Sequence, residues 1–312
     1  MQRPYTVEKW GNKAMGLGEF YSLACAIAWA LAIIVFRKAG QGLSPQHLNL
    51  LKNTVMLAAL TPTMWAFGSP FSLPQSALWA SLISGFIGIA IGDGLYLRAV
   101  QMLGASRAGL AGMLYSPWVV ILSGIWLGES LARGQWLGLG LVLVGLLGVG
   151  LLQRKAVGTA EHGSFSWSGM AIAGAAMALM AAGVVMVKPA LEQQSFLTVV
   201  WYRAIAGTLP LLLWLERPGA APQFRLWSAQ AWSGVKHWGL LLTGCFLGTY
   251  VAMLLWLAGY RYTQASVAAV LNESAALWIM VFAWWFLGDS LSRRQLVCAG
   301  LIATGVMLVL FA

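Results

Sequence analysis

Long apolar stretches follow one another along almost the whole chain, separated by short segments that contain Pro, Gly and basic residues. About twenty apolar residues allow an α-helix to cross the hydrocarbon core of a bilayer. The pattern therefore predicts ten membrane-spanning helices in two sets of five. The first set is predicted at residues 15–36, 46–67, 75–97, 105–127 and 134–152, and the second at 166–187, 196–215, 234–257, 265–287 and 295–311.

Composition supports an all-α integral membrane protein. Of the 312 residues, 60% are hydrophobic and 9% are charged, whereas a soluble domain carries about 25% charged residues. The connections are too short for a large soluble catalytic domain. The net charge is +10, and most of the basic residues stand between the apolar stretches, where anionic lipid headgroups would lie. We therefore expect contact with membrane lipids and no nucleic-acid partner.

Residues for metal or redox chemistry are few. Cys25, Cys245 and Cys298 lie singly inside apolar stretches, and the three histidines lack the spacing of metal ligands. No G-x-x-x-x-G-K-[ST] motif is present, which argues against direct use of ATP. The sequence predicts no metal site, no cofactor and no catalytic residues.

The second half of the chain repeats the first at a spacing of 160 residues. The segment Gly128-Glu129-Ser130-Leu131 recurs as Gly288-Asp289-Ser290-Leu291. The other positions that agree at this spacing are Ala105-Ser106 with Ala265-Ser266, Trp118 with Trp278, Arg133 with Arg293, Gln135 with Gln295, Gly140 with Gly300, and Gly145 with Gly305. Agreement without a gap indicates a duplicated unit.

An odd number of helices in each unit makes the two units enter the membrane from opposite sides, as an inverted repeat. The predicted organisation is a basic tail at 1–14, a first five-helix repeat at 15–152, a linker at 153–165 and a second repeat at 166–312. The first apolar stretch is longer than the 7–15 residues of a secretory signal core, so we interpret it as a membrane helix. Two such halves favour transport by alternating access.

These features resemble the drug/metabolite transporter superfamily, in its ten-helix form with two EamA-type domains. The similar residues of the first half are Trp29-Ala30, Arg37-Lys38, Gly42-Leu43-Ser44-Pro45, Pro117, Leu127-Gly128-Glu129, Gly140 and Gly145. Those of the second half are Leu287-Gly288-Asp289, Gly300 and Gly305, while Leu277 stands where the family has proline. The resemblance implies secondary transport of a small polar solute, as export of an amino acid or as carriage of a nucleotide sugar or phosphorylated sugar.

Glu273 is the strongest candidate for a functional role. It lies beside Asn272, deep in a predicted helix between apolar segments. Because desolvation favours the neutral form of a carboxyl, Glu273 is a candidate for proton coupling or for binding a substrate amine. The alternative is a buried carboxyl hydrogen-bonded within the bundle.

Asp93 and Tyr96 are a second candidate pair, since their spacing places them on one helix face. Asp93 could instead pair with Arg98 or with a neighbouring helix. At the repeat spacing, Asp93 corresponds to Met253, and Tyr115 corresponds to Ala275. Polar residues that break the repeat in this way are the better candidates for substrate contacts, because shared positions serve packing and turning in both halves.

Aromatic residues give weaker signals, because tryptophan favours membrane interfaces in any case. Trp29, Trp118 and Trp278 lie deeper than the interfaces, and the last two correspond in the repeat. They could line or gate a cavity, or simply pack in the core. Pro117 frees a backbone carbonyl, which indicates a cavity near the fourth predicted helix.

The other charged residues are predicted to have structural roles. We expect Glu19, Lys52 and Arg203 to reach headgroups or a water-filled cavity by snorkelling. Two pairs have the i, i+4 spacing of helical ion pairs: Glu129 with Arg133, and Asp289 with Arg293. We interpret each as a turn lock, that is, an ion pair that fixes the turn at the start of a helix.

Orientation is ambiguous. Lys and Arg number 11 on one side of the predicted helices and 6 on the other, which places both termini outside by the positive-inside rule. The family resemblance and the basic N-terminal tail imply the reverse.

The sequence therefore predicts a secondary transporter in the cell (inner) membrane, as a monomer or homodimer, that uses an ion or proton gradient or exchange. Two rivals are an integral-membrane enzyme acting on lipids, and a passive channel or flippase component. The enzyme would need clustered His, Asp or Cys, which the sequence lacks.

Overall fold

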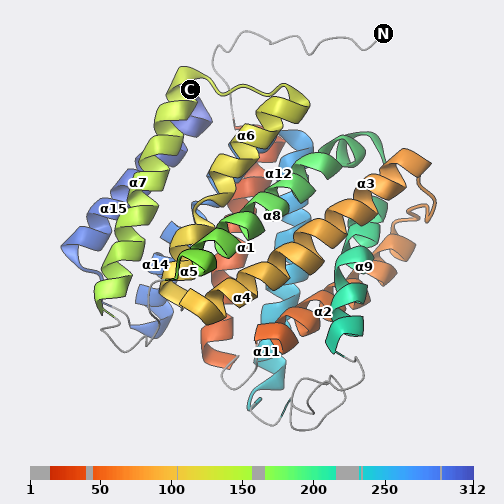
Figure 1. The fold of residues 1–312 in the computed structure, drawn as a ribbon, viewed down its shortest axis with the longest axis horizontal. Helices are drawn as coiled ribbons and strands as arrows, with labels where there is room; N and C mark the ends of the chain where they lie inside the picture. The colour runs from red at the N-terminus through yellow and green to blue at the C-terminus, as the bar shows by residue number, and fades with distance from the viewer. Residues whose placement is uncertain are drawn as a thin grey trace.

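The computed structural model describes residues 15–39, 45–103, 105–156, 166–215, 232, 235–288 and 290–312, and in these residues all regular structure is helical (Figure 1). The first half contains α1 (Leu17–Ala39), α2 (Pro45–Ala66), α3 (Gln75–Gly85), the π-helix η1 (Phe86–Asp93), α4 (Gly94–Leu103), α5 (Ala105–Gly112), α6 (Tyr115–Leu127) and α7 (Arg133–Ala156). The second half contains α8 (Trp167–Gln193), α9 (Phe196–Leu215), α11 (Trp238–Cys245), the π-helix η4 (Phe246–Val251), α12 (Ala252–Tyr262), α13 (Ala265–Asn272), α14 (Ala275–Leu287) and α15 (Arg293–Phe311).

Nine helical stretches within the described residues are long and apolar enough to cross a membrane, so this is a multi-pass membrane protein. They coincide with nine of the ten predicted spans. The stretch predicted at 46–67 is also a helix, α2, of 22 residues. It is less apolar than the others because it carries polar side chains, including Asn49, Lys52 and Asn53.

The two halves share their irregularities as well as their helices. The π-helices begin at Phe86 and Phe246, and a short break separates α5 from α6 after Gly112 and α13 from α14 after Asn272. All of these positions are 160 residues apart. The predicted helices at 105–127 and 265–287 are thus each divided in two.

Pro117 does not cause the break in the first half. It lies in the first turn of α6, where a missing N–H is tolerated. The second half has Leu277 at this position and is broken at the same place. The break is therefore a property of the repeated fold.

The glycines of the repeated motif also act alike. Gly128 and Gly288 end α6 and α14 with φ of +68° and +71°. Glycine adopts this left-handed conformation without the steric cost that a Cβ brings.

Helices α7 and α15 pack against each other in opposite directions at one edge of the molecule (Figure 1). A Cβ on Gly138 would lie 2.6 Å from the carbonyl oxygen of Gly305, and one on Gly305 would lie 2.5 Å from that of Gly138. Further along, Gly145 lies against Ile302. Along this contact, residue numbers increase on α7 while those of the contacting residues on α15 decrease. The two helices are therefore antiparallel, as an inverted repeat requires.

The first helix of each half packs mainly against the other half. Helix α1 contacts α11, η4, α12, α13 and α14, whereas α8 contacts α3, η1, α4, α5 and α6. The main core cluster lies around α8, where Val184, Val185, Val187 and Leu191 are fully buried. This exchange brings polar residues from both halves together in the interior.

Candidate functional site

Glu273 lies in the break between α13 and α14, and it meets the corresponding break of the first half. Ser116, in the first turn of α6, donates a hydrogen bond from Oγ to Oε1 of Glu273. The Glu273 side chain remains partly exposed, whereas Ser116 is buried. Two interrupted helices, one from each repeat, thus present a carboxyl group and its hydroxyl donor at mid-helix depth.

Asn272 precedes Glu273 and has an unused acceptor. Its Nδ2 donates to the carbonyl oxygen of Ala268 at 2.8 Å, but its buried Oδ1 has no hydrogen-bond partner among the residues that the structure describes. The hydroxyl of Ser274, on the other side of Glu273, is also buried without a partner in the described part of the chain. A polar group left unpaired in a buried site costs free energy, so such groups point to a ligand or a second conformation.

Tyr115 connects the glutamate to further polar residues. Its hydroxyl lies 3.0 Å from that of Tyr260 on α12, which is completely buried. Tyr115 interacts electrostatically with Arg203 and Glu273. Sequence reasoning found Tyr115 but missed Tyr260, which looks like an interfacial tyrosine from its place near a helix end.

Asp93 is the last residue of η1 and is partly exposed. It interacts electrostatically with Lys52 and Arg203, but it makes no hydrogen bond or ion pair with any described residue. Within the described residues Asp93 therefore bonds neither to Tyr96, with which it was predicted to share a helix face, nor to Arg98, and the charges that act on it come from neighbouring helices. The Tyr96 ring instead points toward Gly112, with its hydroxyl 3.6 Å from where a Cβ would lie.

Arg203 does not snorkel, contrary to the prediction. Only 3% of it is exposed, and its Nη1 donates to Ser84 Oγ at 2.5 Å and to the carbonyl oxygen of Gly183 at 3.3 Å. Its guanidinium also lies 5.3 Å from the ring centre of Trp256, a cation–π contact. Ser84 on α3 and Gly183 on α8 thus bind the guanidinium in the interior of the bundle.

The deep tryptophans have different surroundings. Trp29 is 38% exposed, and the Lys52 ammonium lies 5.7 Å from the centre of its ring. Trp118 packs against the core around α8, while Trp278 packs against Phe282 with ring centres 6.0 Å apart. The repeat-related pair Trp118 and Trp278 thus belongs to two different clusters.

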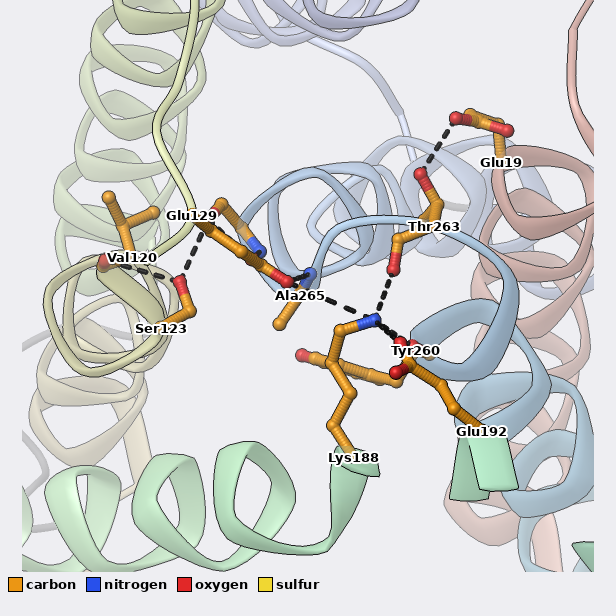
Figure 2. A network of polar contacts seen from close by, with 10 residues as sticks. Glu19, Val120, Ser123, Glu129, Lys188, Glu192, Tyr260, Thr263 and Ala265 are labelled. Atoms are coloured by element: carbon orange, nitrogen blue, oxygen red, sulfur yellow. Dashed lines mark hydrogen bonds and ion pairs between the residues drawn. The ribbon is translucent and has the colours of Figure 1, made fainter. Parts of the chain in front are cut away.

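A second polar network lies where α6 and α8 end and α1 and α13 begin (Figure 2). Lys188, only 6% exposed, donates to Glu192 Oε1 at 2.6 Å and to the carbonyl oxygens of Tyr260 and Thr263, each at 2.7 Å. Thr263 Oγ1 in turn donates to Glu19 Oε1 at 2.7 Å. The network joins helices of both repeats at one end of the bundle.

Glu129 belongs to this network and is not a turn lock. Its carboxylate accepts from the backbone N–H groups of Ala265 and Ser266 at 3.0 and 3.2 Å, and it lies 3.9 Å from Lys188 Nζ. It makes no ion pair with Arg133, although both residues are described. The end of α6 therefore caps the N-terminus of α13, where a negative charge is favourable.

The family model for EamA-like transporters matches residues 16–151 and again residues 167–311. The chain belongs to the EamA-like transporter family. Each match covers one of the two repeats, and together they confirm the predicted drug/metabolite transporter architecture. For this EamA-like transporter, the interior polar residues are candidates for the solute site.

Comparisons with other proteins add the fold alone. No curated protein matches the EamA-like chain significantly. Several solved structures match it, and one of them, a protein crystal structure, does so with a TM-score of 0.73 and 17% sequence identity, covering 94% of this chain and 96% of that one. At such low identity, the match supports a shared fold and leaves the solute to be inferred from this chain's own residues.

Proposed function

We propose that this protein is a secondary transporter that exports a small polar metabolite, such as an amino acid, across the cell inner membrane by alternating access. The proposal rests on one observation. Polar and charged side chains of both repeats lie together at the interrupted helices, and some of their polar atoms have no hydrogen-bond partner within the described residues. Ionisable residues at this depth are costly and mark solute or ion pathways. Broken helices are a common setting for such sites in transporters.

Alternating access is supported by the inverted repeat and by the network at one end of the bundle. Lys188, Glu129 and Thr263 hold helices of both halves together there (Figure 2). We take this network as the closed gate of the conformation described. Opening it would require the Lys188 contacts to break together.

Glu273 is the proposed coupling group. Its carboxyl has a hydroxyl donor in Ser116 and a partly exposed side chain, so it can exchange a proton or bind a solute ammonium. If Glu273 binds the solute on one side of the membrane and a proton on the other, the movement of the solute would be coupled to the opposite movement of protons. The proposed energy source is an ion or proton gradient or solute exchange, in keeping with a sequence that carries no G-x-x-x-x-G-K-[ST] motif.

Counterflow in proteoliposomes tests the function. Vesicles loaded with a mixture of unlabelled amino acids should accumulate labelled amino acids transiently and saturably, because a carrier exchanges solutes one for one. Vesicles with nucleotide sugars or sugar phosphates test the alternative substrates. Flux that rises linearly with concentration would support a channel, and the absence of counterflow with all three classes would contradict the proposal.

A further inference from the structure

Helices α6 and α13 run side by side in opposite directions, and polar contacts join them at three levels. Ser116, in the first turn of α6, donates to Glu273, which directly follows α13. Ser123 Oγ lies 2.8 Å from Ser266 Oγ, near the start of α13. Beyond the end of α6, Glu129 accepts from the backbone N–H of Ser266 at 3.2 Å. The contact therefore extends from the breaks in both helices to the polar network at one end of the bundle.

The serine hydroxyls of this contact are buried and linked to a carboxylate. Ser123 is 0% exposed and Ser266 is 1% exposed. Ser266 Oγ donates to Glu129 Oε2 at 3.1 Å, so the oxygen of Ser266 can accept from Ser123 (Figure 2). Hydrogen bonds that form a buried chain polarise and strengthen one another. When the helices separate, Ser123 still has an acceptor 3.2 Å away in its own helix, the carbonyl oxygen of Val120, so the contact can open and close.

The repeat-related helices α14 and α5 are not joined in this way. At the repeat spacing, α6 corresponds to α14 and α13 corresponds to α5. Helix α14 packs against α1 and α15, and α5 packs against α4, α7 and α8, but in the described part of the chain α14 and α5 make no comparable contact with each other. The conformation is therefore closed where α6 meets α13, and the two helices at the other end stand apart.

Most polar residues of the α6–α13 contact have apolar counterparts in the other half. The counterparts are Ala276 for Ser116, Ala283 for Ser123 and Met113 for Glu273, whereas Ser266 and Glu129 keep Ser106 and Asp289. In an inverted repeat, alternating access exchanges the arrangements of the two halves. After this exchange α14 and α5 would meet, but the two bonds that the serines of α6 now make could not form.

We propose that Ser116 and Ser123 are positioning residues that make the empty transporter favour the conformation closed at the α6–α13 end. This inference rests on the proposed alternating access and specifies how its two conformations are balanced. The closed end has two serine bonds that the exchanged conformation lacks, and one of them is made to the carboxyl group of Glu273. A solute group that binds Glu273 competes with Ser116 for this carboxyl group, so solute binding weakens the closed end and favours its opening.

Labelling of a reporter cysteine in the absence of solute tests this balance. The three native cysteines are replaced by alanine, and Ala265→Cys places the reporter at a fully buried position at the start of α13. The rate at which a water-soluble maleimide labels the purified protein then reports how often this end opens. We expect Ser123→Ala to raise the rate about threefold to tenfold and Ser116→Ala about tenfold or more, because a bond to a charged group contributes more than a neutral one.

Two controls separate opening from unfolding. Ser81 is as fully buried as Ser123, but its hydroxyl donates to the carbonyl oxygen of Ala77 in its own helix. Ser81→Ala should therefore be labelled at the rate of the parent protein. In a second series, Cys245 is the sole cysteine; it is fully buried at the end of α11, in a cluster with residues of α1 and α2, and its labelling should not change.

Unchanged labelling at position 265 in both serine variants would overturn the proposal, and so would an equal increase in Ser81→Ala. With normal counterflow, either result leaves the transport function intact. Faster labelling in the serine variants without any counterflow would support the positioning role and contradict transport instead.

A further variant decides the case in which the serine variants unfold and both cysteines react faster. Ala283→Ser gives α14 the hydroxyl that α6 has at the corresponding position, so it should favour the exchanged conformation. We expect it to raise labelling at position 265 several-fold and to leave Cys245 unlabelled. No increase at position 265 in this variant would overturn the proposal.

Discussion

Several residues in the interior have side-chain polar groups that are not fully hydrogen-bonded within the described residues. Asn272, Ser274 and Arg203 each have a buried side-chain polar atom that finds no partner among the described residues. Asp93 and Glu273 add carboxyl groups that are partly exposed. In a lipid-facing protein these features are expensive, so a solute or a proton is the natural complement.

Glu273→Gln should leave the protein folded, because glutamine has the same shape and can still accept from Ser116. Proton exchange at this position becomes impossible, so transport should either stop or lose its dependence on pH. Initial rates in proteoliposomes between pH 5.5 and 8.5 provide the measurement. Glu273→Asp, which keeps the carboxyl, should retain a pH dependence.

An unchanged rate and pH profile for Glu273→Gln would reject the coupling role. A variant that elutes as an aggregate from size exclusion would be judged through Glu273→Asp instead. In that case, pH-independent transport by the aspartate variant would equally reject the role.

Residue roles were predicted with mixed success. The sequence singled out Glu273, Asp93 and Tyr115 from polarity at depth, and these residues do lie in the interior polar set. Arg203 was wrongly expected to snorkel, because distance along a helix says nothing about which neighbours surround the side chain. Glu129 was wrongly paired with Arg133, because its partners Ala265 and Ser266 lie more than 130 residues further along the chain.

At the scale of elements, the repeated features are those that need particular backbone geometry. Both halves contain a π-helix, a divided helix and a glycine in the left-handed conformation at the same spacing. π-Helical segments are frequently found at functional sites. Here Asp93 is placed at the end of one such segment.

Gly138→Ala and Gly140→Ala test the packing of α7 against α15. A methyl at position 138 would lie 2.6 Å from the Gly305 carbonyl oxygen, whereas one at position 140 meets nothing within 4 Å. We expect Gly138→Ala to destabilise the protein by about 1–3 kcal/mol through overpacking. Gly140→Ala should be neutral or stabilising by up to about 1 kcal/mol, since alanine favours helix.

Thermal unfolding of the two variants in detergent, followed by size exclusion, gives the comparison. Similar melting temperatures for the two variants would show that the contact between α7 and α15 is wide enough to accept a methyl group at position 138. That result would also weaken the antiparallel contact as the support for an inverted repeat.

At the scale of the whole molecule, the first helix of each half packs against the other half, and the polar network around Lys188, which is the proposed gate, joins the halves at one end. Lys188 is central to that gate because three oxygen acceptors surround it within 2.7 Å. Replacing it leaves Glu129 and Glu192 without their cation. The conformation closed at this end should then be less favoured.

Lys188→Ala should therefore increase the access of water-soluble reagents to the gate. Ser266→Cys, introduced after the three native cysteines are replaced by alanine, provides a reporter that is 1% exposed in the wild-type position. An impermeant maleimide should label it several-fold faster in the Lys188→Ala background. Lys236→Ala, at an exposed loop position, is the control, and equal labelling in both backgrounds would contradict the gate.

The positions of the termini test the number of crossings. Ten crossings require both ends of the chain to lie in one compartment, and the count of basic residues places that compartment outside. A reporter that is active only in the cytoplasm should give the same answer when fused to residue 1 or to residue 312. Opposite answers would contradict ten crossings, and two active fusions would reverse the orientation.

The sequence by itself determined the membrane class, nearly all helix positions, the duplication and the family. These depend on local composition and on periodicity, which twenty consecutive residues already contain. The tertiary structure decided how α1 and α8 exchange between halves, where the helices are interrupted and what each charged residue contacts. The Ser116–Glu273 bond joins residues 157 positions apart, and such pairings follow from the packing of whole helices, which no local pattern specifies.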